Sequence, residues 1–343
     1  MEGICKIKEI DDEEWVLFTR EFNEELTPDI IQFLSKYQRV CFGDKYNQSV
    51  ENLPDCITDL VFGNDFNQPI TYQTESSQNG KSHTLLPQSL TRLEFCLGCE
   101  FNQPLTYQTE SSQNGKSPTL LPSGLTQLIF GENSKFNQPV NISDEDSPTG
   151  KCSILPDSLT DLEFGWLFDQ PVDNLPNSLT YLSFGHNFNQ PVTYQTESSQ
   201  NGKSLTLLPE SLTELAFGNS FNQPVDNLPN SLTHLTFEYR FCKSLKNLPK
   251  TLTHLYINGN FYIDKYEDNS IYDLPKSITH LSVNGNFNYI PTSVTHLTVE
   301  MGIHPSQIKY LPDSIEEISL PMLNIMDIRD DIPKKIKINH LLN

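Results

Sequence analysis

The chain has 343 residues, of which 36% are hydrophobic, and this content is enough for a sizeable core. Acidic residues outnumber basic ones by 44 to 23, so the formal charge is −21 and the pI is near 4.6. This charge repels phosphate backbones and anionic lipid, which disfavours nucleic acid and membrane surfaces as partners. No apolar run approaches the ~20 residues that span a bilayer, and the first residues lack the apolar segment of a secretory signal. We therefore expect a cytoplasmic protein.

The N-terminal segment is predicted to be helical. Residues 11–25 place aromatic and apolar side chains at three- and four-residue spacing, which is typical of one helix face. The residues of this stripe are Trp15, Phe18, Phe22 and Leu26. Thr27 is expected to cap a second short helix that begins at Pro28. We interpret residues 1–38 as a helical cap for the repeats that follow, because an exposed array end would leave core side chains in water.

From residue 39 onward the chain repeats a pattern with a period of about 20 residues, which predicts a solenoid of stacked coils. Each coil contains an apolar-x-apolar triplet, whose two apolar residues face the core of a parallel sheet while the middle residue faces outward. We predict about twelve coils over residues 39–331, each with one short strand and an irregular return path, and a C-terminal cap at 332–343. Strands are expected at Val40–Phe42, Leu60–Phe62, Leu93–Phe95, Leu128–Phe130, Leu162–Phe164, Leu182–Phe184, Leu215–Phe217, Leu235–Phe237, Leu255–Ile257, Leu281–Val283, Leu297–Val299 and Ile318–Leu320, and a remnant cap is expected at Ile336–Ile338.

A phenylalanine downstream of most strands is predicted to form an aromatic core layer. These residues are Phe66, Phe101, Phe136, Phe168, Phe188, Phe221, Phe241, Phe261 and Phe287. The asparagine that usually follows is expected to bond to the backbone of the next coil. Polar insertions interrupt the return path at 71–84, 106–119, 141–153 and 193–206, and three of them contain the same Thr-Tyr-Gln-Thr-Glu-Ser-Ser-Gln-Asn-Gly-Lys-Ser. They bury too little to order themselves, so we expect solvated loops on one edge, with a multivalent tag as the alternative.

The motif Leu-x-x-Leu-x-Phe-Gly-x-x-Phe-Asn-Gln-Pro resembles the FNIP repeat, a relative of leucine-rich repeats, over residues 40 to about 330. The family occurs mostly in slime moulds and giant DNA viruses. The resemblance implies a curved solenoid that is used for protein recognition. If the chain is viral, the expected compartment is the host cytoplasm. Many members also carry an N-terminal F-box that docks a ubiquitin ligase. Residues 26–34 are similar to the opening of an F-box, but the first coil begins by Val40, which leaves no room for a complete one.

Four successive coils carry histidine at one outward position, directly before an inward leucine. They are His234, His254, His280 and His296, with Glu214 before them and Glu317 after. Neighbouring Cβ atoms are expected about 5 Å apart. We interpret the column as facing a partner; zinc or nickel binding and a pH-responsive patch are the alternatives. We predict no metal site, because no carboxylate or thiol completes a tetrahedral set. The Cys96-x-x-Cys99 pair also lacks a second pair and is interpreted as packed, reduced thiols.

Outward residues vary between coils whereas inward ones do not, which is typical of a recognition face. The predicted partner-binding residues are Trp166, Tyr181, Glu214, His234, Tyr239, Arg240, His254, Tyr256, His280 and His296, several of them of hot-spot type. Enzyme motifs are lacking, so we predict no catalytic residue and no cofactor. The expected function is a non-catalytic module that binds an unidentified protein. The alternatives are a ubiquitin-ligase substrate adaptor and a structural, self-assembling protein.

Overall fold

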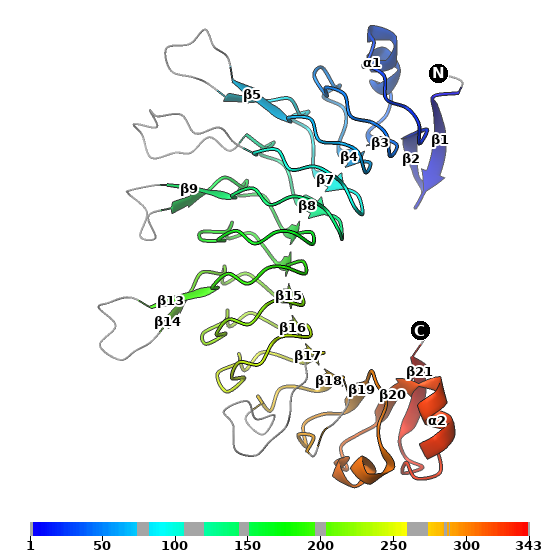
Figure 1. The fold of residues 1–343 in the computed structure, drawn as a ribbon, viewed down its shortest axis with the longest axis vertical. Coiled ribbons are helices and arrows are strands. Elements are labelled where there is room, and N and C mark those ends of the chain that lie inside the picture. Colours follow the sequence, from blue (N-terminus) through cyan, green and yellow to red (C-terminus); the bar gives the residue numbers. More distant parts are fainter. Residues whose placement is uncertain are drawn as a thin grey trace. The chain divides into compact units, whose positions relative to one another are not determined.

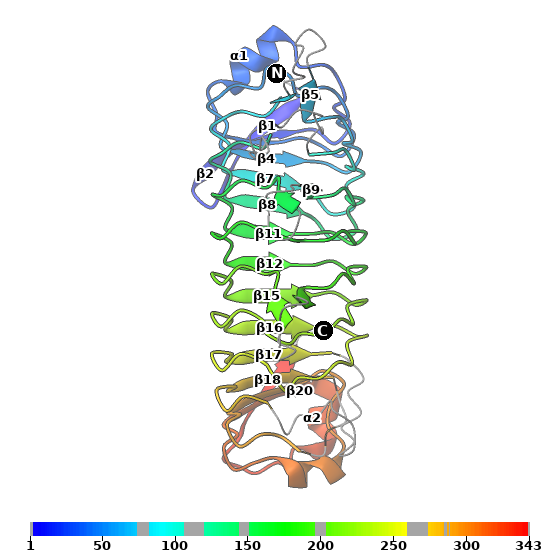
Figure 2. The same cartoon turned by 90° about the vertical axis from the view of Figure 1, so that its left-hand side faces the viewer.

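The computed structural model describes residues 3–73, 82–105, 120–143, 151–195, 204–258, 274–284, 287 and 289–341. They form two units, Met1–Phe188 and Asn189–Asn343. Within each unit one short strand per coil joins a largely parallel sheet, and successive coils lie one above another (Figures 1 and 2). The fold is therefore the predicted repeat solenoid, similar to that of leucine-rich repeats.

Among its described residues, the first unit has a sheet in which all neighbouring pairs are parallel except β1–β2. Its strands, in spatial order, are β1 (Cys5–Ile10), β2 (Glu13–Phe18), β3 (Arg39–Cys41), β4 (Asp59–Phe62), β7 (Arg92–Phe95), β8 (Gln127–Phe130), β11 (Asp161–Glu163) and β12 (Tyr181–Ser183). The alternation of half-buried and buried residues along β4, β7 and β8 puts every leucine and phenylalanine of these strands into the core.

The second unit continues the same pattern, with every described strand of its main sheet parallel to its neighbour. The strands are β15 (Glu214–Phe217), β16 (His234–Phe237), β17 (His254–Ile257), β18 (His280–Val283), β19 (His296–Val299), β20 (Glu317–Pro321) and β21 (Lys337–Leu341). A 3-10 helix (Pro305–Tyr310) and α2 (Met322–Ile328), neither of them predicted, form parts of the last return paths, and α2 packs beside β20 and β21. Every predicted strand segment begins within one residue of an observed strand.

The predicted helix over residues 11–25 is wrong. Residues 13–18 form β2, which pairs with β1 through a turn whose two residues, Asp11 and Asp12, have φ angles of 53° and 64°. Two-residue hairpins favour such positive φ values, because they match the twist of the strands. The burial of Val16 and Phe18 on one face of β2 follows a period of two, and this alternation prevailed over the helical spacing of the aromatic residues.

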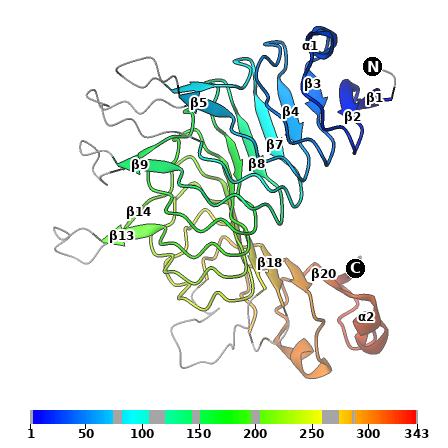
Figure 3. The ribbon, with the colours of Figure 1, turned by 45° about the horizontal axis from the view of Figure 1, so that its top comes forward.

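The second predicted helix is confirmed as α1 (Pro28–Leu34). Thr27 is its N-cap and accepts a hydrogen bond from the backbone N–H of Ile30, while Pro28 occupies the first turn, where no intrahelical donor is needed. Ile30 and Leu34 are buried, so the helix covers core side chains beside the first coils of this unit (Figure 3).

The core contains two columns of aromatic rings, one at the ends of the strands and one four to six residues downstream. In one coil the rings of Phe62 and Phe66 stack with centroids 3.8 Å apart, and Phe66 continues to Phe101 of the next coil at 6.0 Å. The predicted core phenylalanines that the structure describes are all buried: Phe66, Phe101, Phe136, Phe168, Phe188, Phe221, Phe241 and Phe287. Phe261 lies outside the described residues.

The predicted asparagine ladder is confirmed. In the first unit the Oδ1 of Asn67 accepts the backbone N–H of Asn102 at 2.9 Å and the side-chain amide of Gln103 at 3.1 Å. The same contact in the second unit joins the backbone N–H of Asn222 to the Oδ1 of Asn189 at 2.9 Å. These amides satisfy turn groups that the strand ladder does not reach.

Three of the four polar insertions have paired bases, which the sequence analysis did not expect. The antiparallel pairs are β5 (Thr71–Gln73) with β6 (Ser82–Thr84), β9 (Asn141–Ser143) with β10 (Lys151–Ser153), and β13 (Thr193–Gln195) with β14 (Ser204–Thr206). Backbone bonds at the hairpin bases, such as Leu85 N–H to Ile70 O at 2.8 Å, replace the apolar burial that the insertions lack. In the first unit β5 and β9 lie on the side away from β4, β7 and β8 (Figures 1 and 3). The centres of these insertions, and the insertion at 106–119, lie outside the described residues.

Candidate functional site on the strand face

The predicted histidine column forms in the second unit. Strands β16 to β19 pair in register, so His234, His254, His280 and His296 are direct neighbours across the sheet. Their imidazole rings stack with centroids 4.1, 4.1 and 4.2 Å apart and with interplanar angles of 13° to 17°. A parallel sheet spaces strands by about 4.8 Å, and the rings lean together within that spacing.

A groove of about 310 Å³ lies along this column. Besides the histidines, polar side chains of the neighbouring outward column face it. The residues that line it are His234, Leu235, Thr236, His254, Leu255, Tyr256, His280, Leu281, Ser282, His296 and Thr298. None of these residues carries a carboxylate, although the chain as a whole has 44 acidic residues. The groove is therefore a stretch without carboxylates on a strongly acidic protein.

Each histidine of the column is held by the threonine before it. The Nδ1 atoms of His234 and His254 lie 2.9 Å from the hydroxyls of Thr233 and Thr253, and the two later coils repeat the distance. The sequence analysis did not assign these threonines a role. The signal was the triplet Thr-His-Leu, which recurs in all four coils and places a hydroxyl beside each ring.

The two central imidazoles of the column, those of His254 and His280, are held in the neutral form. Burial, followed by repulsion from the neighbouring histidines, lowers the pKa of His254 to about 4. The same causes lower the pKa of His280. Burial, reinforced by Glu238 and Glu300, raises the pKa of Tyr256 to about 12, so this phenol keeps its proton. At neutral pH the groove therefore presents these two neutral rings and the Tyr256 hydroxyl.

This pKa shift predicts a loss of stability in mild acid. The folded-state pKa of His254 lies below the ~6.5 of an unfolded chain, so the unfolded state takes up the proton at a higher pH. The free energy of unfolding should fall as the pH drops from about 6.5 towards about 4, and it should lose no more from this group below that window. Urea unfolding followed by circular dichroism measures the slope. His254→Gln should flatten it and the exposed-site variant His340→Gln should not; equal slopes would contradict the neutral column.

The remaining predicted residues of the second unit lie around the groove rather than in it. Glu214 pairs in register with His234 at one end of the column, and Glu317 pairs with His296 at the other end. The carboxylate of Glu317 accepts hydrogen bonds from Lys337 and Asn339, both at 2.9 Å. Tyr239 and Arg240 follow β16 in a turn and are not among the lining residues.

Two predicted residues of the first unit, Trp166 and Tyr181, contact other residues of that unit. Trp166 lies in the turn after β11 and stacks on His186, with ring centroids 4.5 Å apart. Tyr181 of β12 donates a hydrogen bond to Glu163, whose pKa is raised by burial first and by Glu94 next. Both aromatic residues are thus engaged inside the unit.

Metal and thiol chemistry find little support in the geometry. Across the described part of the chain, no cluster of three or more histidine, cysteine or acidic side chains is arranged to hold a metal ion. Burial raises the pKa of Cys96 to about 11 and that of Cys99 to about 12, so neither thiol readily becomes the thiolate that metals and disulfide exchange require. The Sγ of Cys99 instead contacts the carbonyl oxygen of Gly63 at 3.1 Å, as expected of a packed thiol.

Comparison with known families identifies the repeat. Residues 168–194, 201–240 and 224–260 match the FNIP repeat, and the last two ranges contain β15, β16 and β17. The chain contains FNIP repeats. Repeat folds of this leucine-rich type typically mediate protein interactions and are generally non-catalytic. A comparison with curated proteins found no match to this chain. Within the described residues, no helix has the length and apolar character needed to cross a membrane.

Several solved structures resemble this solenoid. CroV588, described as a novel circular LRR protein, is 26% identical over 95% of this chain and 62% of its own, with a TM-score of 0.46. YopM from Yersinia enterocolitica WA-314 is 16% identical over 83% of this chain and 56% of its own, with a TM-score of 0.39. A leucine-rich repeat protein from Bacteroides ovatus ATCC 8483 is 12% identical over 100% of this chain and 99% of its own, with a TM-score of 0.27. The chain thus spans less than two thirds of the length of the first two.

Proposed function

We propose that this protein is a non-catalytic binding module that holds a protein partner in the groove along the histidine column. The observation that supports the proposal most directly is the coincidence of the groove with the predicted recognition residues His234, His254, Tyr256, His280 and His296. Aromatic side chains with a polar end are common anchors of protein interfaces. The neighbouring outward side chains are small or hydroxylated, which leaves room for a partner segment above them.

Site-specific photo-crosslinking in the cells that produce the protein tests this function. Benzoylphenylalanine in place of Tyr256 should form an adduct with one partner, because this side chain faces the groove. The same group in place of Met301, which is 78% exposed and does not line the groove, is the control. Thr298→Trp should abolish the adduct by filling the groove without adding charge. Equal adducts at both positions, or an adduct that survives Thr298→Trp, would place the interface elsewhere.

The identity of the adduct also separates the two alternatives. A ubiquitin-ligase component would favour the adaptor role, and a second copy of the chain would favour self-assembly. The described N-terminal residues give the adaptor role no support, because β1 and β2 form a hairpin that joins the sheet and only the seven residues of α1 are helical there. The proposed binding function therefore rests on the groove and not on the N-terminal segment.

A further inference from the structure

The four threonine–histidine contacts bear on which ring nitrogen carries the proton. A hydroxyl has one proton to donate, and each of these threonines has two acceptors within reach. The first is Nδ1 of the next histidine at 2.9 Å. The second is the backbone carbonyl of the preceding coil, at 3.2 Å for Thr233 and Thr253, 3.5 Å for Thr279 and 3.3 Å for Thr295.

The geometry favours donation to the histidine. Hydrogen bonds between hydroxyl and carbonyl oxygen are usually about 2.5–3.0 Å long, and all four carbonyl distances exceed that range. The carbonyl is also already occupied: Thr213 O accepts the backbone N–H of Thr233 at 2.9 Å and of His234 at 3.1 Å. A hydroxyl that donates to Nδ1 makes this atom the acceptor, so the proton of the neutral ring is on Nε2.

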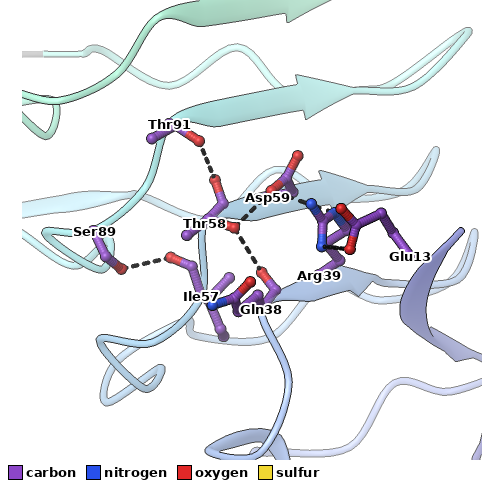
Figure 4. Close-up of polar contacts among 8 residues, drawn as sticks. All are labelled: Glu13, Gln38, Arg39, Ile57, Thr58, Asp59, Ser89 and Thr91. Atoms are coloured by element: carbon purple, nitrogen blue, oxygen red, sulfur yellow. Dashed lines mark hydrogen bonds and ion pairs between the residues drawn. The ribbon is translucent and has the colours of Figure 1, made fainter. Parts of the chain in front are cut away.

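The first unit contains an internal control for this assignment. Thr58 occupies the same position in its coil, but the next residue is Asp59, whose Oδ2 lies 2.7 Å from the Thr58 hydroxyl (Figure 4). An ionised carboxylate only accepts, so here the threonine must be the donor. Its distance to the carbonyl of Gln38 is 3.4 Å, as long as in the histidine coils. Thr160 and Asp161 repeat the short hydroxyl–carboxylate contact at 2.6 Å, although the carbonyl of Thr126 lies only 3.1 Å from the same hydroxyl.

We propose that the groove of the second unit binds an acidic peptide segment of its partner, through a row of histidine Nε2–H donors whose tautomer the preceding threonines set. This inference rests on the proposed function and specifies the chemistry of the partner. The complementarity lies in the lining: the imidazoles offer N–H, and Tyr256, Thr236 and Thr298 offer hydroxyls. Carboxylates accept from all of these groups, and charged acceptors give the stronger bonds.

The same tautomer disfavours a metal ion. With the proton on Nε2, the free lone pair of each ring is the Nδ1 pair that already accepts the threonine hydroxyl. The rings also stack within 13° to 17° of parallel, so their lone pairs do not converge on a common point. A tetrahedral ion needs converging donors.

Binding of an acidic segment should take up protons. A carboxylate beside the column offsets the repulsion between imidazolium rings, and this favours protonation at Nδ1. The threonine hydroxyl can then accept from Nδ1–H, so the ring keeps its threonine contact in both protonation states. The other charged groups near the column are Glu214 and Glu317 at its ends, Lys337 beside Glu317, and Glu238 and Glu300 on the side of Tyr256. None of these groups lines the groove.

Two measurements on the intact chain test the inference. Long-range proton–nitrogen NMR correlations of ¹⁵N-histidine-labelled protein report the tautomer, with His→Gln variants to assign the signals. We expect a pyridine-type Nδ1 and a pyrrole-type Nε2 in all four rings; the reverse pattern would overturn the assignment. Fluorescence anisotropy then measures binding of labelled oligoglutamate, oligoglutamine and oligolysine. Oligoglutamate should bind best, and about tenfold more tightly at about pH 5.5 than at about pH 7.5.

Two substitutions of His254 distinguish the contribution of its N–H donor to binding from the contribution of its protonated, charged form. His254→Leu removes the donor and should weaken oligoglutamate binding about three- to tenfold at both pH values. His254→Gln keeps an N–H but takes up no proton, so it should bind normally near neutral pH and gain less on acidification. His340→Gln, outside the groove, should change neither. Preference for oligolysine, or no oligoglutamate binding by folded protein, would overturn this inference; the crosslink at position 256 would still stand if the proposed function is right.

Discussion

Replacement of Phe66 by alanine is expected to lower the free energy of unfolding by about 3–5 kcal/mol. The ring is fully buried and stacks on Phe62 at 3.8 Å within its coil. It also contacts rings of the coils before and after it, Tyr46 at 6.2 Å and Phe101 at 6.0 Å. Its removal leaves a cavity in a column that both neighbouring coils use, and in a stacked array each coil contacts only its neighbours, so no distant coil can compensate.

Urea unfolding followed by circular dichroism measures this loss, and hydrogen exchange locates it. We expect the fastest-exchanging amides of the variant in β3, β4 and β7, since repeat arrays can open locally. Leu97→Ala is the control: this side chain is 59% exposed in the same unit and should change stability by less than about 0.5 kcal/mol. Equal unfolding curves for Phe66→Ala and the parent chain would contradict the aromatic column as the main support of the coils.

The period of the repeat made most of the fold predictable, because every coil places the same residue types at the same positions. Strand positions, buried phenylalanines and the asparagine ladder all follow from local patterns that recur many times. The N-terminal segment was mispredicted because its pattern supports two interpretations. Val16, Phe18, Phe22 and Asn23 reproduce the repeat spacing, yet the same aromatic residues also fit a helix.

Asn23 shows which interpretation the structure follows. Its Oδ1 accepts the backbone N–H of Asn47 at 2.8 Å, the first contact of the asparagine ladder. Phe18 stacks on Phe42 of the next coil at 4.9 Å. Long-range contacts with the following coil thus decided between two local preferences, and such contacts are visible in a sequence only when the repeat register is extended backwards.

The histidine column was predictable to the level of its register but not of its chemistry. Alternation along a strand places His254 outward and next to His234 and His280. Whether the column binds metal depends on the orientation of the rings and on which ring nitrogen carries the proton, and the sequence alone shows neither. In the proposed assignment the Thr253 hydroxyl, 2.9 Å from Nδ1 of His254, orients the ring and leaves the proton on Nε2. The neighbouring residue of each histidine therefore carried the missing information.

Replacement of Gly63 by alanine should destabilise the protein by about 2–3 kcal/mol, although it adds a single methyl group. A Cβ atom here would lie 2.7 Å from the Cα of Asp44 and also against the carbonyl of Gly43, and both are backbone of the preceding coil. Backbone cannot turn aside as a flexible side chain can, so the coils would have to separate and stretch the ladder. The glycine of the Phe-Gly motif is thus a spacing requirement between coils.

Gly124→Ala provides the matched control for that experiment. A Cβ atom at this position meets no atom within 4 Å, and the residue lies in the same unit. We expect it to be neutral or to stabilise by up to about 1 kcal/mol, because alanine restricts the unfolded chain more than glycine does. Thermal and urea unfolding of the two variants side by side measure the difference. If both lose the same stability, the cost arises from the backbone conformation of turns in general; if only Gly63→Ala does, it arises from the close approach of one coil to the next.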